Sequence, residues 1–383
     1  MSAKSHQISG EETLFELTVT KASFLKALSH CQGVVERRNT VPILGNILLE
    51  AHGSNLTVSA TDLEIAYVET LSAQIQASGS TTVSAHLLFD IIRKLPDGAD
   101  IELQMTEGGG ALTLRSGRSN YTFACLPAID FPLMTTENLP CTFKIHAAEL
   151  SRLIDKTRFS MSTEETRYYL NGIFFHPTTD GFLRAIATDG LRLAQAQREL
   201  PPEASAMPSV IIGRKTIHEI RKLIDETPEE ITISLSENQI RFAVGPSILI
   251  SRLIEGKFPE YEKVIPLEND IILEIDAKAF AEAVDRISLM STDKLRPVKI
   301  RIEGTTMTLS AHGNDTGRAV EEMEVSYTGE PLEFGFNARF ILDVAQQITS
   351  QKLEFRLGVD DQPILAKDAT DDSALYVLMP MRI

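Results

Sequence analysis

Hydrophobic positions along the chain follow two alternating patterns, and the alternation recurs three times. Six segments carry apolar residues at helical spacing, which predicts helices. They are residues 21–30, 85–95, 146–155, 214–224, 276–285 and 337–348. After each segment come stretches in which apolar and polar residues alternate between turn-forming residues, a pattern typical of strands. Each repeat of about 125 residues is therefore predicted to run strand, helix, three strands, twice over.

A short phrase marks the first two repeats. The chain reads SATDLEIAYV at 59–68 and IATDGLRLAQ at 186–195. Asp62 and Asp189 could be imagined as paired catalytic carboxylates, but their equivalent positions place them in separate repeats. We interpret the phrase as an architectural turn at a strand end. The residues after the aspartate differ, so residues 190–193 of the second copy are candidates for a role of their own.

The strands are short and alternating, which is typical of antiparallel sheets with one solvated face. Two helices per repeat cannot cover both faces, so they should pack on one, and the fold class is α+β rather than doubly wound. Proline-rich joints separate the repeats. We therefore expect three repeated domains after a disordered extension. The extension is 1–13, and the domains are 14–137, 138–266 and 267–383.

Composition is that of an ordinary globular protein, with 43% hydrophobic and 23% charged residues. No apolar run is long enough to span a membrane, and the polar first residues lack the core of a signal peptide. The three cysteines form no Cys-x-x-Cys pair, which favours buried thiols in a reducing compartment. We expect a cytoplasmic protein with no membrane partner.

The net charge of −16 argues against nucleic acid for the chain as a whole, but the charge is unevenly distributed. Seventeen basic and eight acidic residues fall in or beside the six helical segments, a net charge of +9, so the remainder carries −25. One explanation is that helices simply display solvated charges. The other is a single positive surface, which would bind the phosphates of duplex DNA without reading sequence.

Motifs for catalysis and metal binding are missing from the sequence. We find no His-Glu-x-x-His, Gly-x-Ser-x-Gly, P-loop or dinucleotide-binding motif and no zinc-ligand spacing, and the eight histidines are scattered. The sequence therefore predicts a protein that is not an enzyme and needs no cofactor or metal.

Several phrases together resemble the bacterial replicative sliding clamps, the beta subunits of DNA polymerase III. They are VPILGNILLEA, ATDLE, RSGRS, RYYLNG, ATDGLRLA, FPEY and the terminal YVLMPMRI. The resemblance runs from about residue 14 to the end of the chain and implies three similar domains. It also implies that two chains close head to tail into a ring around duplex DNA. Such a ring would do no chemistry and would tie a polymerase to its template.

Helix packing favours a ring of two chains. Helices pack about 10 Å apart, so six would line a circle about 19 Å across, and their own thickness would leave no room for a duplex. Twelve would line a circle about 38 Å across and leave about 28 Å clear, enough for a hydrated duplex. A homodimer is therefore predicted.

The resemblance also implies which residues bind DNA. Arg38 corresponds to a DNA-contacting loop residue, and Arg214 and Lys215 correspond to contacts in the phrase GRK. Three further cations are candidates for the positive lining. They are Lys26, Arg93 and Arg167. The loop before Arg167, STEET, is more acidic than in the best-known clamp.

For the head-to-tail interface, the resemblance implies the last strand of domain 1 and a helix end of domain 3. The corresponding residues are Tyr121 and Phe123 on one side, and Leu289 and Met290 on the other. Burial in the core of each domain is the alternative for all four.

The apolar end of the chain, YVLMPMRI, indicates either a buried last strand or an adaptable binding surface, since methionines suit varied partners. The resemblance implies a pocket for short linear peptides, formed by this tail with TDGLRL and FPEYEKV. The corresponding residues are Leu170, Thr188, Gly190, Leu191, Arg192, Leu193, Pro259, Lys263, Val264, Asn337, Phe340, Pro363, Val377, Leu378, Met379, Pro380, Met381 and Arg382. Leu191, Lys263 and Phe340 stand where the family commonly has histidine, arginine and tyrosine, which makes this pocket more apolar.

The partners that the resemblance implies are the catalytic subunit of the replicative polymerase, the clamp loader, and other polymerases and repair proteins that carry clamp-binding peptides. The ring would work in the cytoplasm, associated with the nucleoid during replication. The alternative is a protein-binding scaffold that never encircles DNA. A scaffold would explain the pocket but not the basic helices.

Overall fold

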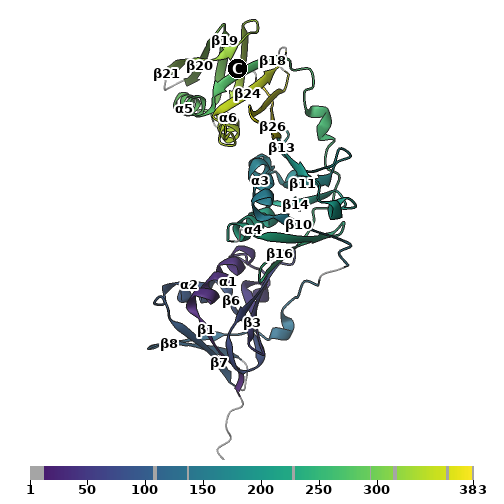
Figure 1. Ribbon diagram of the computed structural model, residues 1–383. Helices are drawn as coiled ribbons and strands as arrows, with labels where there is room; N and C mark the ends of the chain where they lie inside the picture. Colours follow the sequence, from purple (N-terminus) through teal and green to yellow (C-terminus); the bar gives the residue numbers. More distant parts are fainter. Residues whose placement is uncertain are drawn as a thin grey trace, which may run out of the picture. The chain divides into compact units, whose positions relative to one another are not determined.

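The computed structural model describes residues 13–106, 110–135, 138–226, 229–293, 295–313, 317–358 and 362–381. Residues 1–12 of the predicted extension and the pocket candidate Arg382 lie outside these ranges. The chain divides into two compact units (Figure 1). Unit 1 comprises residues up to 147 together with 218–252, and unit 2 comprises 148–217 together with 253 onward.

Unit 1 contains two antiparallel sheets. The first has the order β5-β1-β7-β8-β9. Its strands are β1 (Thr13–Thr20), β5 (Gln74–Ala77), β7 (Asp100–Thr106), β8 (Ala111–Ser116) and β9 (Ser119–Ala124). The second has the order β10-β15-β16-β17-β4-β3-β2-β6. Its strands are β2 (Asn46–His52), β3 (Asn55–Thr61), β4 (Ile65–Ser72), β6 (Gly79–Ser84), β10 (Cys141–His146), β15 (Glu230–Leu235), β16 (Gln239–Val244) and β17 (Ser247–Arg252).

Unit 2 also contains two antiparallel sheets. The larger has the order β14-β11-β12-β13-β26-β25-β24-β18-β22. Its strands are β11 (Gly172–Pro177), β12 (Phe182–Thr188), β13 (Arg192–Glu199), β14 (Val210–Gly213), β18 (Ile271–Asp276), β22 (Ser326–Tyr327), β24 (Lys352–Leu357), β25 (Ile364–Asp368) and β26 (Asp371–Leu378). The smaller has the order β21-β20-β19-β23. Its strands are β19 (Pro297–Glu303), β20 (Thr306–Gly313), β21 (Gly317–Glu324) and β23 (Leu332–Asn337).

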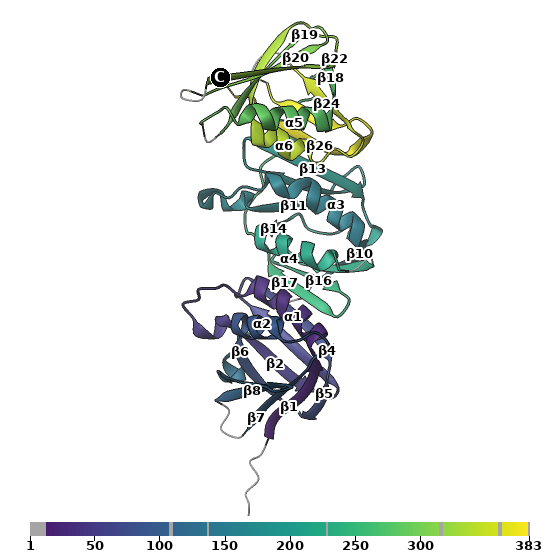
Figure 2. The same ribbon diagram turned by 90° about the vertical axis from the view of Figure 1, so that its left-hand side faces the viewer.

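Six α-helices lie in the described part of the chain. They are α1 (Lys21–Val34), α2 (Ala85–Lys94), α3 (Ala147–Thr157), α4 (Arg214–Ile224), α5 (Ala277–Ser288) and α6 (Ala338–Ala345). Helices α1 and α2 lie side by side, as do α5 and α6 (Figure 2). Their buried residues recur at helical spacing, such as Ala85, Leu88 and Ile92 in α2, so each helix buries one apolar stripe. None of the described helices is long and apolar enough to cross a membrane.

The predicted order of strand, helix and three strands, twice per repeat, is confirmed. Short strands, β5 and β22, are added between the halves of the first and third repeats. In the segment VPILGNILLEA, strand β2 begins only at Asn46, because Pro42 opens a 3-10 turn over Pro42–Gly45. The helices as observed carry thirteen basic and seven acidic side chains, a net charge of +6. The +9 counted in the sequence also includes charges beside the helices, such as Arg37 and Arg38, which lie beyond the end of α1.

Two strand pairings explain why three repeats give two units. Strand β17 of the second repeat pairs antiparallel with β4 of the first. Strand β26 of the third repeat pairs in the same way with β13 of the second. Each pairing joins two half-repeats into one continuous sheet. The middle repeat is therefore divided between the units, and the predicted domain boundaries follow the repeats rather than the compact units.

Candidate functional site

The repeated ATD phrase forms a side-chain-stabilised turn between β12 and β13. The Thr188 hydroxyl donates to the carbonyl of Arg192 at 2.6 Å and accepts from the amide of Gly190 at 3.1 Å. The Asp189 carboxylate accepts from the amides of Leu191 and Arg192, each at 3.0 Å. Such local bonds are the reason that threonine and aspartate favour turns.

The first copy forms the same turn between β3 and β4. The Thr61 hydroxyl donates to the carbonyl of Ile65 at 2.9 Å and accepts from the amide of Leu63 at 3.0 Å. The Asp62 carboxylate accepts from the amides of Glu64 and Ile65 at 2.9 and 2.7 Å. The architectural interpretation of the phrase is therefore confirmed.

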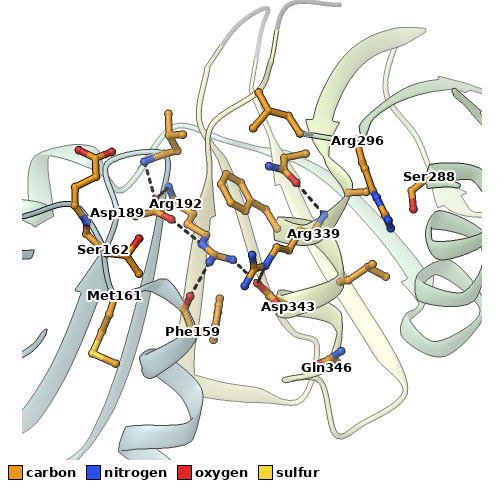
Figure 3. Close-up of a pocket in the computed structure, with 18 of the residues that line it drawn as sticks. Phe159, Met161, Ser162, Asp189, Arg192, Ser288, Arg296, Arg339, Asp343 and Gln346 are labelled. Atoms are coloured by element: carbon orange, nitrogen blue, oxygen red, sulfur yellow. Dashed lines mark hydrogen bonds and ion pairs between the residues drawn. The ribbon is translucent and has the colours of Figure 1, made fainter. Parts of the chain in front are cut away.

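The second copy differs because Arg192 follows the turn. This side chain is 7% exposed, and its guanidinium binds both Asp189 at 3.0 Å and Asp343 of α6 at 2.6 Å (Figure 3). It also donates to the carbonyl of Phe159 at 2.7 Å. Its guanidinium carbon lies 4.4 Å from the ring centre of Phe340, within the range of a cation–π contact. Arg192 thus fastens the turn of the second repeat to the last helix of the third.

A cavity of about 690 Å³ opens beside this arginine. Its walls come from the β12–β13 turn, the segment after α3, the end of α5 and helix α6 (Figure 3). Four pocket candidates line it. They are Leu191, Arg192, Asn337 and Phe340. The side chain of Asn337 also caps α6, because it accepts from the amide of Arg339 at 3.0 Å.

An apolar cluster holds three further candidates, Leu170, Leu193 and Val377. They pack with other side chains of unit 2, among them Phe258 and Tyr261, from the proline-rich joint. The phrases that the sequence analysis connected therefore meet in one cluster. The remaining candidates of the joint are more exposed, with Val264 44% exposed and Lys263 paired with Glu260. Pro363 lies next to β25, and its carbonyl accepts from the Asn269 amide at 2.9 Å.

The end of the chain continues past β26 along the same wall. Within β26, Val377 lies opposite Leu193, and Leu378 is fully buried. The amide of Met379 donates to the carbonyl of Leu191 at 3.0 Å. The amide of Met381 donates to the carbonyl of Gly335 at 2.7 Å, and Met379, Pro380 and Met381 are only half-buried. Both alternatives for the tail therefore apply: the strand is buried, and the residues after it are accessible.

Two predicted DNA contacts, Arg167 and Arg214, lie near the second copy of the turn and the cavity beside it. Arg167 holds Glu164 at 2.8 Å, and its guanidinium lies against Gly190, where an added Cβ would be 2.6 Å from Nη1. Arg214 lines the cavity and donates to the carbonyls of Met161 and Ser162. Burial lowers the pKa of Arg214.

The other predicted DNA contacts lie on or near helices. On α1, Lys26 is exposed and paired with Glu226 at 2.8 Å. On α2, Arg93 is paired with Asp90 at 3.2 Å. Lys215 is half-buried near the start of α4. Arg38, in the loop after α1, is exposed, and no ion pair is found for it among the described residues.

The interface candidates lie at a strand edge of unit 1 and at a helix end of unit 2. Tyr121 and Phe123 are on β9, the edge strand of its sheet, with Tyr121 half-buried and Phe123 buried. Leu289 follows α5 and is 65% exposed, and Met290 is half-buried beside it. Burial in the core of a domain, the alternative to an interface role, therefore applies to Phe123 but not to Leu289.

Several residues of the pocket were missed in the sequence. Asp343 and Phe159 hold Arg192, and neither belongs to the phrases that carried the resemblance. Within α6, Asp343 lies four residues after Arg339, at 3.8 Å, a helical spacing that could have marked it.

Family models match all three repeats of the chain. Models of the DNA polymerase III beta subunit match at residues 15–135 (N-terminal domain), 144–260 (central domain) and 262–382 (C-terminal domain). The beta sliding clamp of Caulobacter vibrioides is 47% identical over 96% of this chain and 100% of its own length. The Escherichia coli clamp is 35% identical over the same shares.

Solved structures agree with the sequence relatives. The Caulobacter crescentus clamp, with polyethylene glycol bound to a putative beta-motif tethering region, superposes with a TM-score of 0.93 at 47% identity. A Bartonella birtlesii clamp bound to griselimycin superposes with a TM-score of 0.94 at 44% identity. Both comparisons cover 96% of this chain and 100% of the other. The chain belongs to the DNA polymerase III beta subunit family, the non-catalytic beta sliding clamps.

Proposed function

We propose that this chain acts as a sliding clamp and processivity factor, in which two copies form a ring around duplex DNA. The ring slides without sequence preference and holds the replicative polymerase to its template. The observation that supports the ring is the presence of two matching open strand edges, β9 in unit 1 and β21 in unit 2.

The repeat architecture gives these edges their partners. Within the chain, β17 pairs with β4, and β26 pairs with β13. In each pair, one strand is the last of its repeat. The other strand ends the first half of the preceding repeat. By the same rule, β9 should join the β21 of another chain. Two such contacts related by rotation close a head-to-tail ring.

The rule also predicts the register of this contact. The phrases SGRSN and VGPSI align Asn120 with Ile248. Ser59 of β3 lies opposite Val68, and Ser310 of β20 lies opposite Val320. Since these two serines occupy the same position in their repeats, Val320 aligns with Val68. Since Ile248 lies opposite Val68, Asn120 of one chain should lie opposite Val320 of the other.

This register supports the interface candidates. It sets Tyr121 opposite Ala319 and Phe123 opposite Gly317, all on one side of the strands. A Cβ added at Gly317 would lie 4.0 Å from the Met290 methyl. The exposed positions, Asn120 and Val320, then fall together on the other side, as a correct register requires.

Disulfide trapping tests the ring. Asn120→Cys combined with Val320→Cys, in a Cys125→Ser background, should give covalent dimers, because opposite residues have close Cβ atoms. Asn120→Cys with Glu322→Cys is the matched control, displaced by two residues on the same side, and should cross-link poorly. Equal cross-linking of both pairs would contradict the register.

DNA retention tests encirclement itself. The trapped dimer should stay on nicked circular DNA at high salt and be lost when the DNA is linearised. Equal retention on both forms would rule out topological binding and favour a scaffold that does not encircle DNA.

The basic residues are proposed to line the ring through phosphate contacts. They are Lys26, Arg38, Arg93, Arg167, Arg214 and Lys215. Arg38 is the strongest of these, because it is exposed and carries no ion pair within the described ranges. Arg38→Glu should weaken the binding of DNA by the clamp before the ring closes. The salt dependence of the binding constant should fall by the equivalent of about one phosphate contact. Lys299→Glu, on β19, is a charge-matched control.

The pocket of unit 2 is proposed to bind short linear peptides of the polymerase catalytic subunit, the clamp loader, and other polymerases and repair proteins. The apolar cluster, the half-buried methionines after β26 and the adjacent cavity support this. As part of the same proposal, the ring works in the cytoplasm at the nucleoid. Peptides from this organism's own polymerase should bind unit 2 of the full-length dimer with a stoichiometry of one per chain.

A further inference from the structure

Unit 1 contains a second cavity, of about 320 Å³, beside the first copy of the ATD turn. Its walls come from that turn, from the proline-rich joint after the first repeat and from the ends of β16 and β17. The lining includes Thr61, Leu63, Leu133, Met134, Gln239 and Arg252.

The residues of this cavity correspond to candidates of the proposed peptide pocket around the second copy of the turn, which lie next to the 690 Å³ cavity of unit 2 rather than in its lining. The two turns share the same threonine and aspartate hydrogen bonds, so Thr61 and Leu63 correspond to Thr188 and Gly190. The joints align through the phrases FPLM and FPEY, which pair Pro132 with Pro259.

The strands agree with this match. Strand β17 pairs with β4 as β26 pairs with β13, which makes Arg252 the counterpart of Met379. Strand β16 pairs with β17 as β25 pairs with β26, and Gln239 lies opposite Arg252. Gln239 is therefore the counterpart of Pro363, the residue that precedes β25. Five lining positions of the unit 1 cavity therefore correspond to positions of the proposed peptide pocket.

A hydrogen bond holds the proline-rich joint after the first repeat in place at the unit 1 cavity. Gln239 is buried, and its side-chain amide donates to the carbonyl of Thr135 at 3.2 Å. This bond fixes the segment that carries Leu133 and Met134 next to the end of β16. Leu133 is nevertheless 61% exposed, so its side chain is available to a ligand.

Leu63 makes the turn of unit 1 more apolar than its counterpart. Its φ is +79°, a left-handed conformation that glycine adopts readily and leucine rarely does. Gly190 has a φ of +91° at the equivalent position. The leucine is 48% exposed at the cavity, and strained residues that persist cluster at functional sites.

Among the described residues that line the cavity, Arg252 is the one that carries a charge, and its side chain is exposed. No ion pair of Arg252 is found in the part of the chain that the structure describes. A carboxylate is the ligand group that a planar guanidinium of this kind binds most specifically.

We propose that this cavity is a second binding site for a short linear peptide. An apolar side chain of the peptide packs among Leu63, Leu133 and Met134, and a carboxylate binds Arg252. The class of ligand rests on the proposed function of the unit 2 pocket, whereas the chemistry rests on the unit 1 residues themselves.

Methionine methyl resonances of the full-length protein test the proposal, because Met134 reports on this cavity and Met379 on the unit 2 pocket. The probe is acetyl-Gly-Leu-Phe with a free carboxylate, and its C-terminal amide is the matched control. Met134→Leu assigns the resonance. The acid should shift Met134 saturably, and the amide should bind about tenfold more weakly.

Two variants confirm the contacts. Arg252→Gln should remove the preference for the acid, and Leu133→Ser should weaken both probes. No saturable Met134 shift at about 5 mM acid would overturn the proposal, as would equal binding of acid and amide. A Met379 that fails to respond to a polymerase peptide would instead count against the unit 2 pocket alone, so the two failures are distinguishable.

Discussion

The guanidinium of Arg192 lies 4.4 Å from the ring centre of Phe340 and 2.6 Å from the carboxylate of Asp343, so one side chain after a turn holds both residues of α6. Arg192→Ala should remove the ion pair of Asp189 and the shorter of the two ion pairs of Asp343, and both aspartates are partly buried. We expect the free energy of unfolding of the second and third repeats to fall by about 2–4 kcal/mol in urea titrations.

Arg339 provides the control for this prediction. It also approaches Asp343, at 3.8 Å, but its side chain is 79% exposed. Arg339→Ala should change the same free energy by less than about 0.5 kcal/mol. Equal losses in the two variants would mean that the burial of Arg192 does not matter.

Gly190 should tolerate no side chain, for two separable reasons. Its positive φ disfavours any Cβ, and the Cβ would press against Arg167. Gly181→Ala is the matched control, since Gly181 has a φ of +87° and nothing within 4 Å of an added Cβ. We expect Gly181→Ala to cost about 1 kcal/mol and Gly190→Ala clearly more, measured by thermal unfolding.

A double-mutant cycle isolates the contact with Arg167. Adding Arg167→Ala to Gly190→Ala should recover the excess over the control. No recovery would place the cost of Gly190→Ala elsewhere.

Leu191 is 55% exposed in the lining of the unit 2 cavity, so its substitution should affect binding more than folding. Leu191→Asp should weaken a polymerase peptide by about tenfold or more in calorimetric titration, with an unfolding midpoint close to that of the unchanged protein. Leu267→Asp is the control, since Leu267 is 90% exposed and is absent from the lining of the cavity.

A buried polar cluster should make unit 1 sensitive to pH. His30 contacts Tyr67 at 2.8 Å, Glu69 at 3.4 Å and Glu226 at 2.8 Å. Burial opposes charging of the ring, but the hydrogen bonds to Glu69 and Glu226 outweigh it and raise the pKa of His30. The stabilisation is therefore complete below about pH 6.5 and is lost as the pH rises through the raised pKa.

His30→Gln should remove this loss. Urea unfolding should show the unchanged protein becoming less stable as the pH rises above about 6.5, and the variant changing less over the same interval. His52→Gln, at the exposed end of β2, should behave like the unchanged protein. A variant as pH-sensitive as the parent would assign the effect to another group.

The sequence predicted most of the fold because helix and strand periodicities are local, and because three repeats supply each prediction three times. It predicted less of the site. The sequence makes Arg167 a candidate DNA contact but does not predict its contact with Gly190, because that contact depends on how two loops pack. The bond between Arg192 and Asp343 spans 151 residues, and no local pattern encodes it. The cavity beside Leu63 became visible only when the two copies of the turn could be compared in space.

The pairing of β17 with β4 also constrains how the chain is completed during synthesis. The first repeat ends near residue 137, but one of its sheets has a strand edge that is covered only by residues 247–251. That edge therefore stays open while more than a hundred further residues leave the ribosome. An exposed edge is a template for pairing with other chains. Slow translation of the second repeat should therefore increase aggregation of the nascent first repeat.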